Sequence, residues 1–254
     1  MQITLLPSAF SSSGREAHQY LTSYVINGTV AIDAGALGLF QSSDEQSRIR
    51  HVFITHTHID HIASLPLFVD NIYRAAPECV VVHGSESVLE CLREDIFSKR
   101  LWAEYLKLGP AEAPFLRLSL LRPGETVEVE NLRLTPIAVD HTVPTLGLII
   151  EDGQSAILIP SDTGPTEEIW ERAGRLPNLK AVFLEASFPN SFADIANLSK
   201  HLTPEMFAIE MRKLRQPTRF IAVHIKVRHY AQVTAELAAL PNVEIVKPGH
   251  MYRF

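Results

Sequence analysis

The sequence predicts an α/β fold in the form of a four-layer αβ/βα sandwich. Short apolar segments rich in Val, Ile and Leu, the pattern of buried strands, recur through both halves of the 254 residues. Segments of helical character separate them, so each half repeats the order of strand and helix. No linker or low-complexity tract interrupts the chain. We therefore expect residues 1–254 to form a single domain, a length that suits one substantial core.

The first half of the chain is predicted to alternate strands and helices. Asn27 and Gly28 are the sequence signal of a tight hairpin turn, and Ser85 is placed to cap a helix. Apolar pairs recur at helical spacing between 96 and 108. We expect a helix there that covers the site, forms a homodimer contact or packs as an ordinary core helix. The remaining expectations are strands at 3–6, 20–26, 29–32, 51–54 and 80–83, helices at 41–50, 65–75 and 85–92, and a loop at 11–14.

The second half repeats this order. Thr203 is a residue type that caps helices, and Pro204 stands at the first helical position, where proline is favoured. Residues 151–153, Glu-Asp-Gly, indicate a turn. The remaining expectations are strands at 126–129, 132–138, 146–150, 156–159, 180–184 and 220–223, and helices at 166–172 and 203–214.

The segment 55–61 reads Thr-His-Thr-His-Ile-Asp-His and directly follows a predicted buried strand. Neutral imidazoles and carboxylates are ligands that zinc, manganese and iron accept. Since an extended chain alternates its faces, His56 and His58 should point the same way. Asp60 and His61 follow where the chain turns and can address a second point in space. The spacing therefore predicts a site for two metal ions.

This His-x-His-x-Asp-His pattern resembles the signature of the metallo-β-lactamase superfamily. The resemblance implies the sandwich fold of that superfamily. It also implies that Asp33, which follows an earlier predicted strand, braces the metal-site loops from behind without being a ligand. The alternative interpretation of Asp33 is a plain turn residue.

Three further donors stand where strands are predicted to end. His141, Asp162 and His224 each follow an apolar segment, and a site for two ions needs several more ligands than the first cluster supplies. We predict two divalent ions, by default Zn²⁺ with Mn²⁺ as the alternative. The predicted ligands are His56, His58 and His141 for the first ion, Asp60, His61 and His224 for the second, and Asp162 as the bridge.

Two later segments resemble the class II cyclic-nucleotide phosphodiesterases. Residues 185–188 read Glu-Ala-Ser-Phe, an E-x-S-F pattern, and residues 200–204 read Lys-His-Leu-Thr-Pro, close to a G-H-L-T-P pattern. Lys200 and Ser161 stand where glycine is usual in that family. Neither departure removes a predicted ligand.

This second resemblance implies hydrolysis of 3′,5′-cyclic nucleotides, cyclic AMP and/or cyclic GMP, to 5′-nucleotides by water activated between two metal ions. His201 is our candidate for the group that protonates the leaving 3′ oxygen, with Glu185 holding it in place. A merely structural bond beside a helix start is the alternative for His201. Asp60 completes the expected catalytic set. The alternative reactions are those of a tRNase Z-like or other phosphodiester hydrolase and of a lactonase-type carbonyl hydrolase.

Composition bounds the partners and the location. The formal net charge is −6 and no block of Lys or Arg occurs, which argues against long nucleic acid as a partner. No apolar run approaches a membrane span and no signal peptide is evident. Cys79 and Cys91 are the only cysteines and are expected to be buried thiols. We therefore expect a cytoplasmic protein without a membrane partner that acts on a small cyclic nucleotide.

Overall fold

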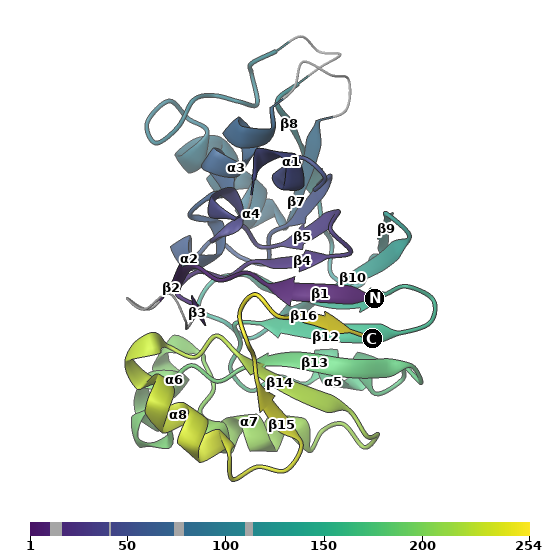
Figure 1. Cartoon of the computed structure of the whole chain (residues 1–254), viewed down its shortest axis with the longest axis vertical. Coiled ribbons are helices and arrows are strands. Elements are labelled where there is room, and N and C mark those ends of the chain that lie inside the picture. The colour runs from purple at the N-terminus through teal and green to yellow at the C-terminus, as the bar shows by residue number, and fades with distance from the viewer. Residues whose placement is uncertain (11–16, 41, 74–78, 110–113) are drawn as a thin grey trace. The chain divides into compact units, whose positions relative to one another are not determined.

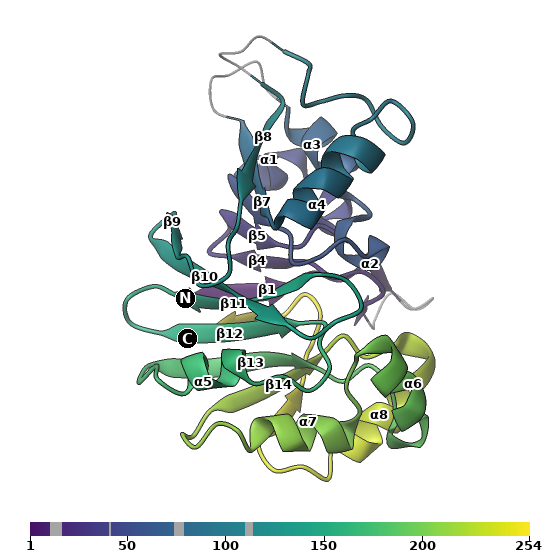
Figure 2. The ribbon, with the colours of Figure 1, turned by 180° about the vertical axis from the view of Figure 1, so that it is seen from behind.

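The chain forms two mixed seven-stranded sheets with helices beside each of them (Figure 1, Figure 2). This computed structural model bears out the alternation of strands and helices that the sequence predicts. The loop expected at 11–14 lies outside the residues that the structure describes. The described residues are 1–10, 17–40, 42–73, 79–109 and 114–254.

Contacts divide the chain into two units, each built around one of the sheets. The N-terminal unit consists of Gln2–Leu121 and Pro248–Arg253, and the C-terminal unit of Arg122–Lys247 with Met1 and Phe254. Each unit buries an apolar cluster of its own. The expectation of a single domain stays a prediction.

The sheet of the N-terminal unit supports the segment 55–61. Antiparallel pairs join β16, β1, β4 and β5, whereas β5, β6, β7 and β8 run parallel. The carboxyl ends of the parallel strands lie at one edge of the sheet, and the segment 55–61 follows β6 at that edge. In spatial order the strands are β16 (Met251–Arg253), β1 (Gln2–Leu5), β4 (Tyr24–Ile26), β5 (Val30–Ile32), β6 (His51–Phe53), β7 (Val80–Gly84) and β8 (Leu116–Leu120).

Most of the expected helices of this unit are present. Ser85 caps α4 (Glu86–Cys91), because its hydroxyl accepts a hydrogen bond from the backbone N–H of Val88. The helix expected at 41–50 is shorter than predicted. The other elements are β2 (Ala9–Phe10), β3 (Ala17–His18), η1 (Leu37–Leu39), α1 (Ser43–Gln46), α2 (Ile59–Ile62), α3 (Leu65–Ile72) and η2 (Leu92–Ile96).

The prediction of a helix between 96 and 108 is wrong. Turns and bends follow η2, and Lys99 adopts a left-handed φ of 69°. Two rings of this segment are nevertheless packed, although Leu101 and Leu108 are exposed. The ring of Tyr105 stacks on Phe97 with centroids 5.7 Å apart and on Phe115 at 4.8 Å. The spacing of apolar residues here reflects burial of a loop against the core, which periodicity alone cannot distinguish from a helix.

The sheet of the C-terminal unit places three predicted site residues side by side. Strands β9 to β12 pair antiparallel and β12 to β15 pair parallel. Asp162, Glu185 and His224 lie at the carboxyl ends of the adjacent strands β12, β13 and β14. In spatial order the strands are β15 (Val243–Ile245), β14 (Arg219–Val223), β13 (Leu179–Glu185), β12 (Ala156–Ser161), β11 (Thr145–Glu151), β10 (Leu132–Val139) and β9 (Val127–Val129).

Helix α7 (Pro204–Met211) begins where the sequence predicts. The hydroxyl of Thr203 accepts a hydrogen bond from the N–H of Met206 at 3.4 Å, and Pro204 is the first helical residue. The other elements are α5 (Glu168–Ala173), η3 (Asn190–Phe192), α6 (Ala193–Ser199), η4 (Val227–His229) and α8 (Tyr230–Leu237).

Within the described parts of the chain, no helix has the length and apolar character needed to cross a membrane. Cys79 and Cys91 are free thiols, as expected, but are half-buried rather than buried. The cytoplasmic location stays a prediction.

Gly35 allows the segment that begins α2 and carries Asp60 to pack tightly in the N-terminal unit. The N–H of Gly35 donates to the carbonyl of Thr22 at 3.0 Å, and the N–H of Thr22 donates to the carbonyl of Asp60 at 2.7 Å. A Cβ on Gly35 would lie 2.0 Å from that Asp60 oxygen and 2.8 Å from the Thr22 nitrogen. Both obstacles are backbone atoms, so any larger residue must displace that segment.

We therefore expect Gly35→Ala to destabilise the protein by about 3 kcal/mol or more and to lower its metal content. Gly28→Ala is the control, because Gly28 has a φ of 75° but nothing within 4 Å of the added Cβ; it should cost about 1–2 kcal/mol and leave metal content unchanged. Urea unfolding and elemental analysis measure both quantities. Equal behaviour of the two variants would contradict the packing argument.

Candidate metal centre

The N-terminal unit gathers four of the predicted ligands around the end of β6. His56 and His58 lie on the extended chain, and their ring centroids are 4.8 Å apart, as expected from their shared face. Asp60 and His61 lie in α2, and the rings of His61 and His56 are 4.1 Å apart. His56 and His61 are buried, whereas His58 and Asp60 are half-buried.

Asp33 braces this group from behind, as the resemblance implied. Its Oδ2 accepts a hydrogen bond from Nδ1 of His61 at 2.7 Å, and its Oδ1 accepts from the backbone N–H of Thr55 at 2.8 Å. The hydroxyl of Thr55 also lies 2.9–3.0 Å from the two carboxylate oxygens and 3.0 Å from Nδ1 of His56. Since the single hydroxyl hydrogen goes to the carboxylate, the Thr55 oxygen accepts from His56. Both imidazoles are thereby held with Nδ1 protonated and with Nε2 as the nitrogen that can bind a metal.

The C-terminal unit gathers the other predicted site residues. Nε2 of His224 lies 3.4 Å from Oδ2 of Asp162, and Nδ1 of His201 lies 2.6 Å from Oε1 of Glu185. The ring of His141 is 5.0 Å from that of His201. All five side chains are buried. Glu185, His201 and His224 also have nitrogen and oxygen atoms within 4.8 Å of one another.

Glu185 is anchored by hydrogen bonds on both carboxylate oxygens. Oε1 accepts from the N–H of Thr163 at 3.0 Å as well as from His201, and Oε2 accepts from the N–H groups of Ser187 and Leu202, each at 3.2 Å. Burial raises the pKa of Glu185, but the charge and hydrogen bond of His201 outweigh burial and leave that pKa below its usual value. Burial lowers the pKa of His201, but the charge and hydrogen bond of Glu185, together with the charge of Asp162, outweigh burial and raise that pKa.

Ser187 connects two of the histidines, a role that the sequence analysis did not assign. Its hydroxyl donates a hydrogen bond to the carbonyl of His224 at 3.0 Å. The same hydroxyl oxygen accepts a hydrogen bond from Nδ1 of His224 at 2.9 Å. Nδ1 of His201 is 3.3 Å away. The bond to Nδ1 leaves Nε2 of His224 as the nitrogen that faces Asp162. The signal was available in the serine of the E-x-S-F pattern itself.

Left-handed backbone recurs beside the site residues. Asp33 has a φ of 59°, Ser161 of 64°, Lys200 of 52° and His224 of 54°, in a region that costs a non-glycine residue about 1–2 kcal/mol. Lys200 and Ser161 are the two positions where the resembled family usually has glycine. The geometry explains that preference, because glycine adopts this conformation without strain.

Lys200 makes two interactions beside the site. Its carbonyl accepts a hydrogen bond from Nδ1 of His141 at 3.0 Å, and its Nζ pairs with Oδ1 of Asp140 at 2.5 Å. The first interaction requires only the backbone and fixes the ring of His141, whereas the second is specific to lysine. Lysine can therefore replace glycine here while the proposed ligand stays oriented.

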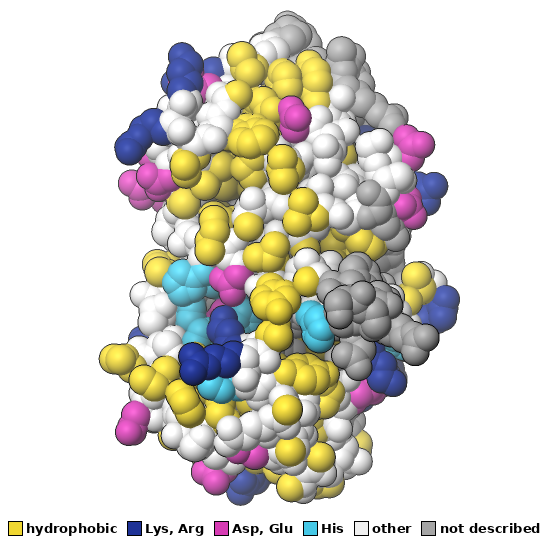
Figure 3. All heavy atoms as spheres, turned by 60° about the vertical axis from the view of Figure 1, so that its left-hand side comes forward, with side chains coloured by type: hydrophobic (Ala, Val, Ile, Leu, Met, Phe, Trp, Pro, Cys, Tyr) yellow, Lys and Arg dark blue, Asp and Glu magenta, His cyan; other side chains and the backbone are white. Residues whose placement is uncertain are grey.

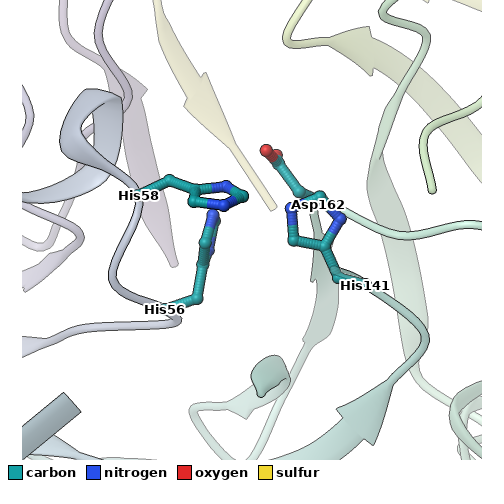
Figure 4. A group of neighbouring side chains, drawn as sticks. All are labelled: His56, His58, His141 and Asp162. Atoms are coloured by element: carbon teal, nitrogen blue, oxygen red, sulfur yellow. The ribbon is translucent and has the colours of Figure 1, made fainter. Parts of the chain in front are cut away.

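The donors fit a divalent metal both in the type of atom that they offer and in the orientation of their side chains. They are imidazoles and carboxylates, and a hydrogen bond from Nδ1 orients four of the rings, as is usual for histidine ligands of zinc. Figure 4 draws four of the donors, His56 and His58 of the N-terminal unit and His141 and Asp162 of the C-terminal unit. The identity of the metal stays a prediction.

Histidine and aspartate donors at the ends of the strands place this chain among the metal-binding proteins of the α/β class. A family model described as "Beta-lactamase superfamily domain" matches residues 29–225. The chain belongs to this superfamily, in its metallo-β-lactamase branch, as the sequence predicts. Its fold is similar to that of unliganded yeast PDE1, with a TM-score of 0.79, 17% identity and 98% of each chain covered.

Two curated proteins are similar to large parts of the chain. The probable 3′,5′-cyclic-nucleotide phosphodiesterase of Yersinia pestis is 26% identical over 184 residues, which cover 66% of this chain and 52% of that protein. The ribonuclease BN of Proteus mirabilis (strain HI4320) is 24% identical over 249 residues, covering 79% of each protein. The match to the Yersinia protein thus spans only about half of that protein's length.

The role of Asp33 yields a prediction. Asp33→Asn keeps the shape of the side chain but removes the carboxylate that orients His61, so metal affinity should fall about 10- to 100-fold. Asp44→Asn, an exposed substitution in α1, should leave affinity unchanged. Competition of the protein with a chelator for Zn²⁺ measures the constants. An unaltered affinity in Asp33→Asn would mean that Asp33 serves only the turn.

Proposed function

We propose that the predicted donors hold two divalent ions. The first ion would be bound by His56, His58 and His141 and the second by Asp60, His61 and His224, with Asp162 shared. Within each unit the proposed ligands lie close together: the rings of His56 and His61 are 4.1 Å apart, and Nε2 of His224 is 3.4 Å from Oδ2 of Asp162. Membership of the superfamily and the orientation of four of the five ligand imidazoles, those of His56, His61, His141 and His224, support this assignment. When bound, two such ions lower the pKa of water towards about 7 and neutralise charge on a phosphate.

We propose further that the reaction is hydrolysis of a 3′,5′-cyclic nucleotide to a 5′-nucleotide. In that reaction an oxygen of water forms a bond to phosphorus, the bond from phosphorus to the 3′ oxygen breaks, and the 3′ oxygen takes up a proton. His201 is the proposed donor. Its Nδ1 bonds to Glu185, so the proton that it transfers is carried by Nε2. The pair of His201 and Glu185 is the observation that carries the proposal.

The buried His201–Glu185 pair favours phosphodiester chemistry over carbonyl chemistry. An alkoxide leaving group needs a proton in the transition state, and a histidine held by a carboxylate supplies it. The E-x-S-F and H-L-T-P segments that provide this pair resemble those of class II phosphodiesterases. The Yersinia relative, a probable cyclic-nucleotide phosphodiesterase, is consistent with this substrate class.

A second candidate is cleavage of a phosphodiester in RNA. It is favoured by the Proteus relative, named ribonuclease BN, which matches over 79% of the chain. The same His201–Glu185 pair would serve that reaction. The net charge of −6 without a basic block favours the small substrate.

A screen of substrates tests the choice. Metal-loaded protein is given cyclic AMP, cyclic GMP, bis-p-nitrophenyl phosphate, a lactone and a pre-tRNA, and kcat/KM is measured for each. We expect a cyclic nucleotide to be turned over best and chelation to abolish turnover. Turnover of the lactone alone, or of pre-tRNA alone, would replace the proposed reaction.

A pair of variants separates the proton donor from the ligands. His201→Ala should keep both metals, and its kcat on a cyclic nucleotide should fall about 10²- to 10⁴-fold. The loss should shrink on a p-nitrophenyl phosphodiester, because p-nitrophenolate leaves without a proton. His224→Ala should lose metal and be impaired on both substrates. Loss of metal in His201→Ala would identify His201 as a ligand instead.

A further inference from the structure

A row of aromatic rings leads away from His201 in the C-terminal unit. The ring of Phe188 meets that of His201 edge-on with centroids 5.7 Å apart. His229 follows at 6.1 Å from Phe188, and Phe192 at 4.8 Å from His229. We call Phe188, His229 and Phe192 the aromatic row. Its first member touches the residue proposed to donate the proton.

Exposure rises along the aromatic row. His201 is buried, Phe188 and His229 are half-buried, and Phe192 is 39% exposed. The row is therefore not part of the closed apolar core of this unit, which contains none of the three rings. Partly exposed rings close to a buried reactive group are typical of a surface that binds a ligand.

Backbone hydrogen bonds hold the segments that carry the rings. The N–H of Phe188 donates to the carbonyl of Leu202 at 3.3 Å, that of Phe192 to Pro189 at 2.9 Å, and that of His229 to Lys226 at 2.8 Å. Phe188 lies in the loop after β13 and Phe192 at the end of η3, close to each other in sequence, whereas His229 comes from η4, far along the chain. A row assembled in this way is preorganised, which lowers the entropy cost of binding.

Basic side chains accompany the row. Lys226 is half-buried and Arg228 is exposed, and both lie in the segment that carries His229. The charge of Lys226 lowers the pKa of His201, so Lys226 is within electrostatic reach of it. In the space-filling view, histidine, basic and hydrophobic side chains lie next to one another on one face (Figure 3). A ligand suited to this combination has a flat apolar ring and a negative charge.

A protein partner is the competing explanation. Helix α6 exposes Ile195 by 45% and Leu198 by 79% close in sequence to Phe192, so an apolar contact surface could include all three. The edge-on and tilted ring contacts, however, join only the aromatic rings, and they start at His201. An aliphatic contact surface would require neither feature.

We propose that Phe188, His229 and Phe192 form a stacking platform for the nucleobase of a nucleotide, with Lys226 and Arg228 on the side of its phosphate. The proposal rests on the proposed function in that it takes the substrate to be a nucleotide. Stacking of a base on an aromatic side chain tolerates different bases. The platform would therefore accept adenine and guanine alike.

The test measures binding rather than turnover. Dissociation constants of metal-loaded protein for 5′-AMP and for ribose 5-phosphate, which lacks the base, are obtained by calorimetry. Phe192→Ala should weaken binding of 5′-AMP by about 5- to 100-fold and that of ribose 5-phosphate much less. Phe192→Tyr keeps an aromatic ring at this position and should bind 5′-AMP like the wild type. Leu198→Ala, the control on α6, should bind both ligands like the wild type.

Each other outcome overturns the platform. Equal binding of the two ligands by the wild type, or equal weakening of both in Phe192→Ala, would show that the base is not recognised there. An effect of Leu198→Ala as large as that of Phe192→Ala would indicate a general apolar contact surface. Because neither ligand is hydrolysed in this experiment, failure of the proposed reaction in the substrate screen leaves the test of the platform intact.

Discussion

In each unit the proposed ligands depend on one buried carboxylate, and both oxygens of that carboxylate accept hydrogen bonds. Asp33 and Glu185 are each 1% exposed, and a buried carboxylate is tolerated only where hydrogen bonds replace its lost hydration. Asp33 finds them in His61 and in Thr55, Glu185 in His201 and in backbone N–H groups. Satisfying the carboxylate and orienting the imidazole are therefore the same event. The desolvation cost that opposes burial of the carboxylate thus enforces the orientation of the histidines.

The second constraint is conformational. The residues beside the donors leave their strands through left-handed turns, so the site is assembled from backbone that most side chains avoid. Ser161 and Lys200 show that the fold tolerates a side chain where glycine would be unstrained. Such strain persists where surrounding hydrogen bonds over-determine the conformation, and the bond from His141 to the carbonyl of Lys200 is one of these. The sharp turns bring donors from successive strands to one edge of each sheet.

The sequence was most informative where chemistry and periodicity agree. The cluster at 55–61 and the donors at 141, 162 and 224 follow apolar strands, and strands that run in the same direction bring such ends to one edge of their own sheet regardless of the details of packing. Sequence reasoning failed where tertiary packing decides. Residues 97–109 bury apolar side chains in a loop, and strands as short as β15 and β16 carry too few residues to show a period. The E-x-S-F pattern marks Ser187 as a position of interest, but the hydrogen-bond partners of Thr55 and Ser187 could not be predicted, because a hydroxyl bonds to whatever the fold brings within reach.

The segment 185–188 joins chemistry to recognition. Glu185 holds His201, Ser187 contacts His201 and His224, and Phe188 begins the aromatic row. The first two side chains use their polar atoms on buried partners, which fixes them, whereas the ring of Phe188 remains half-buried. Proton transfer requires positions accurate to a fraction of an ångström, but stacking tolerates rings of different size and offset. In the proposed function, this division would let the outer rings of the row change the preferred substrate while the carboxylate and serine keep the proton donor in place.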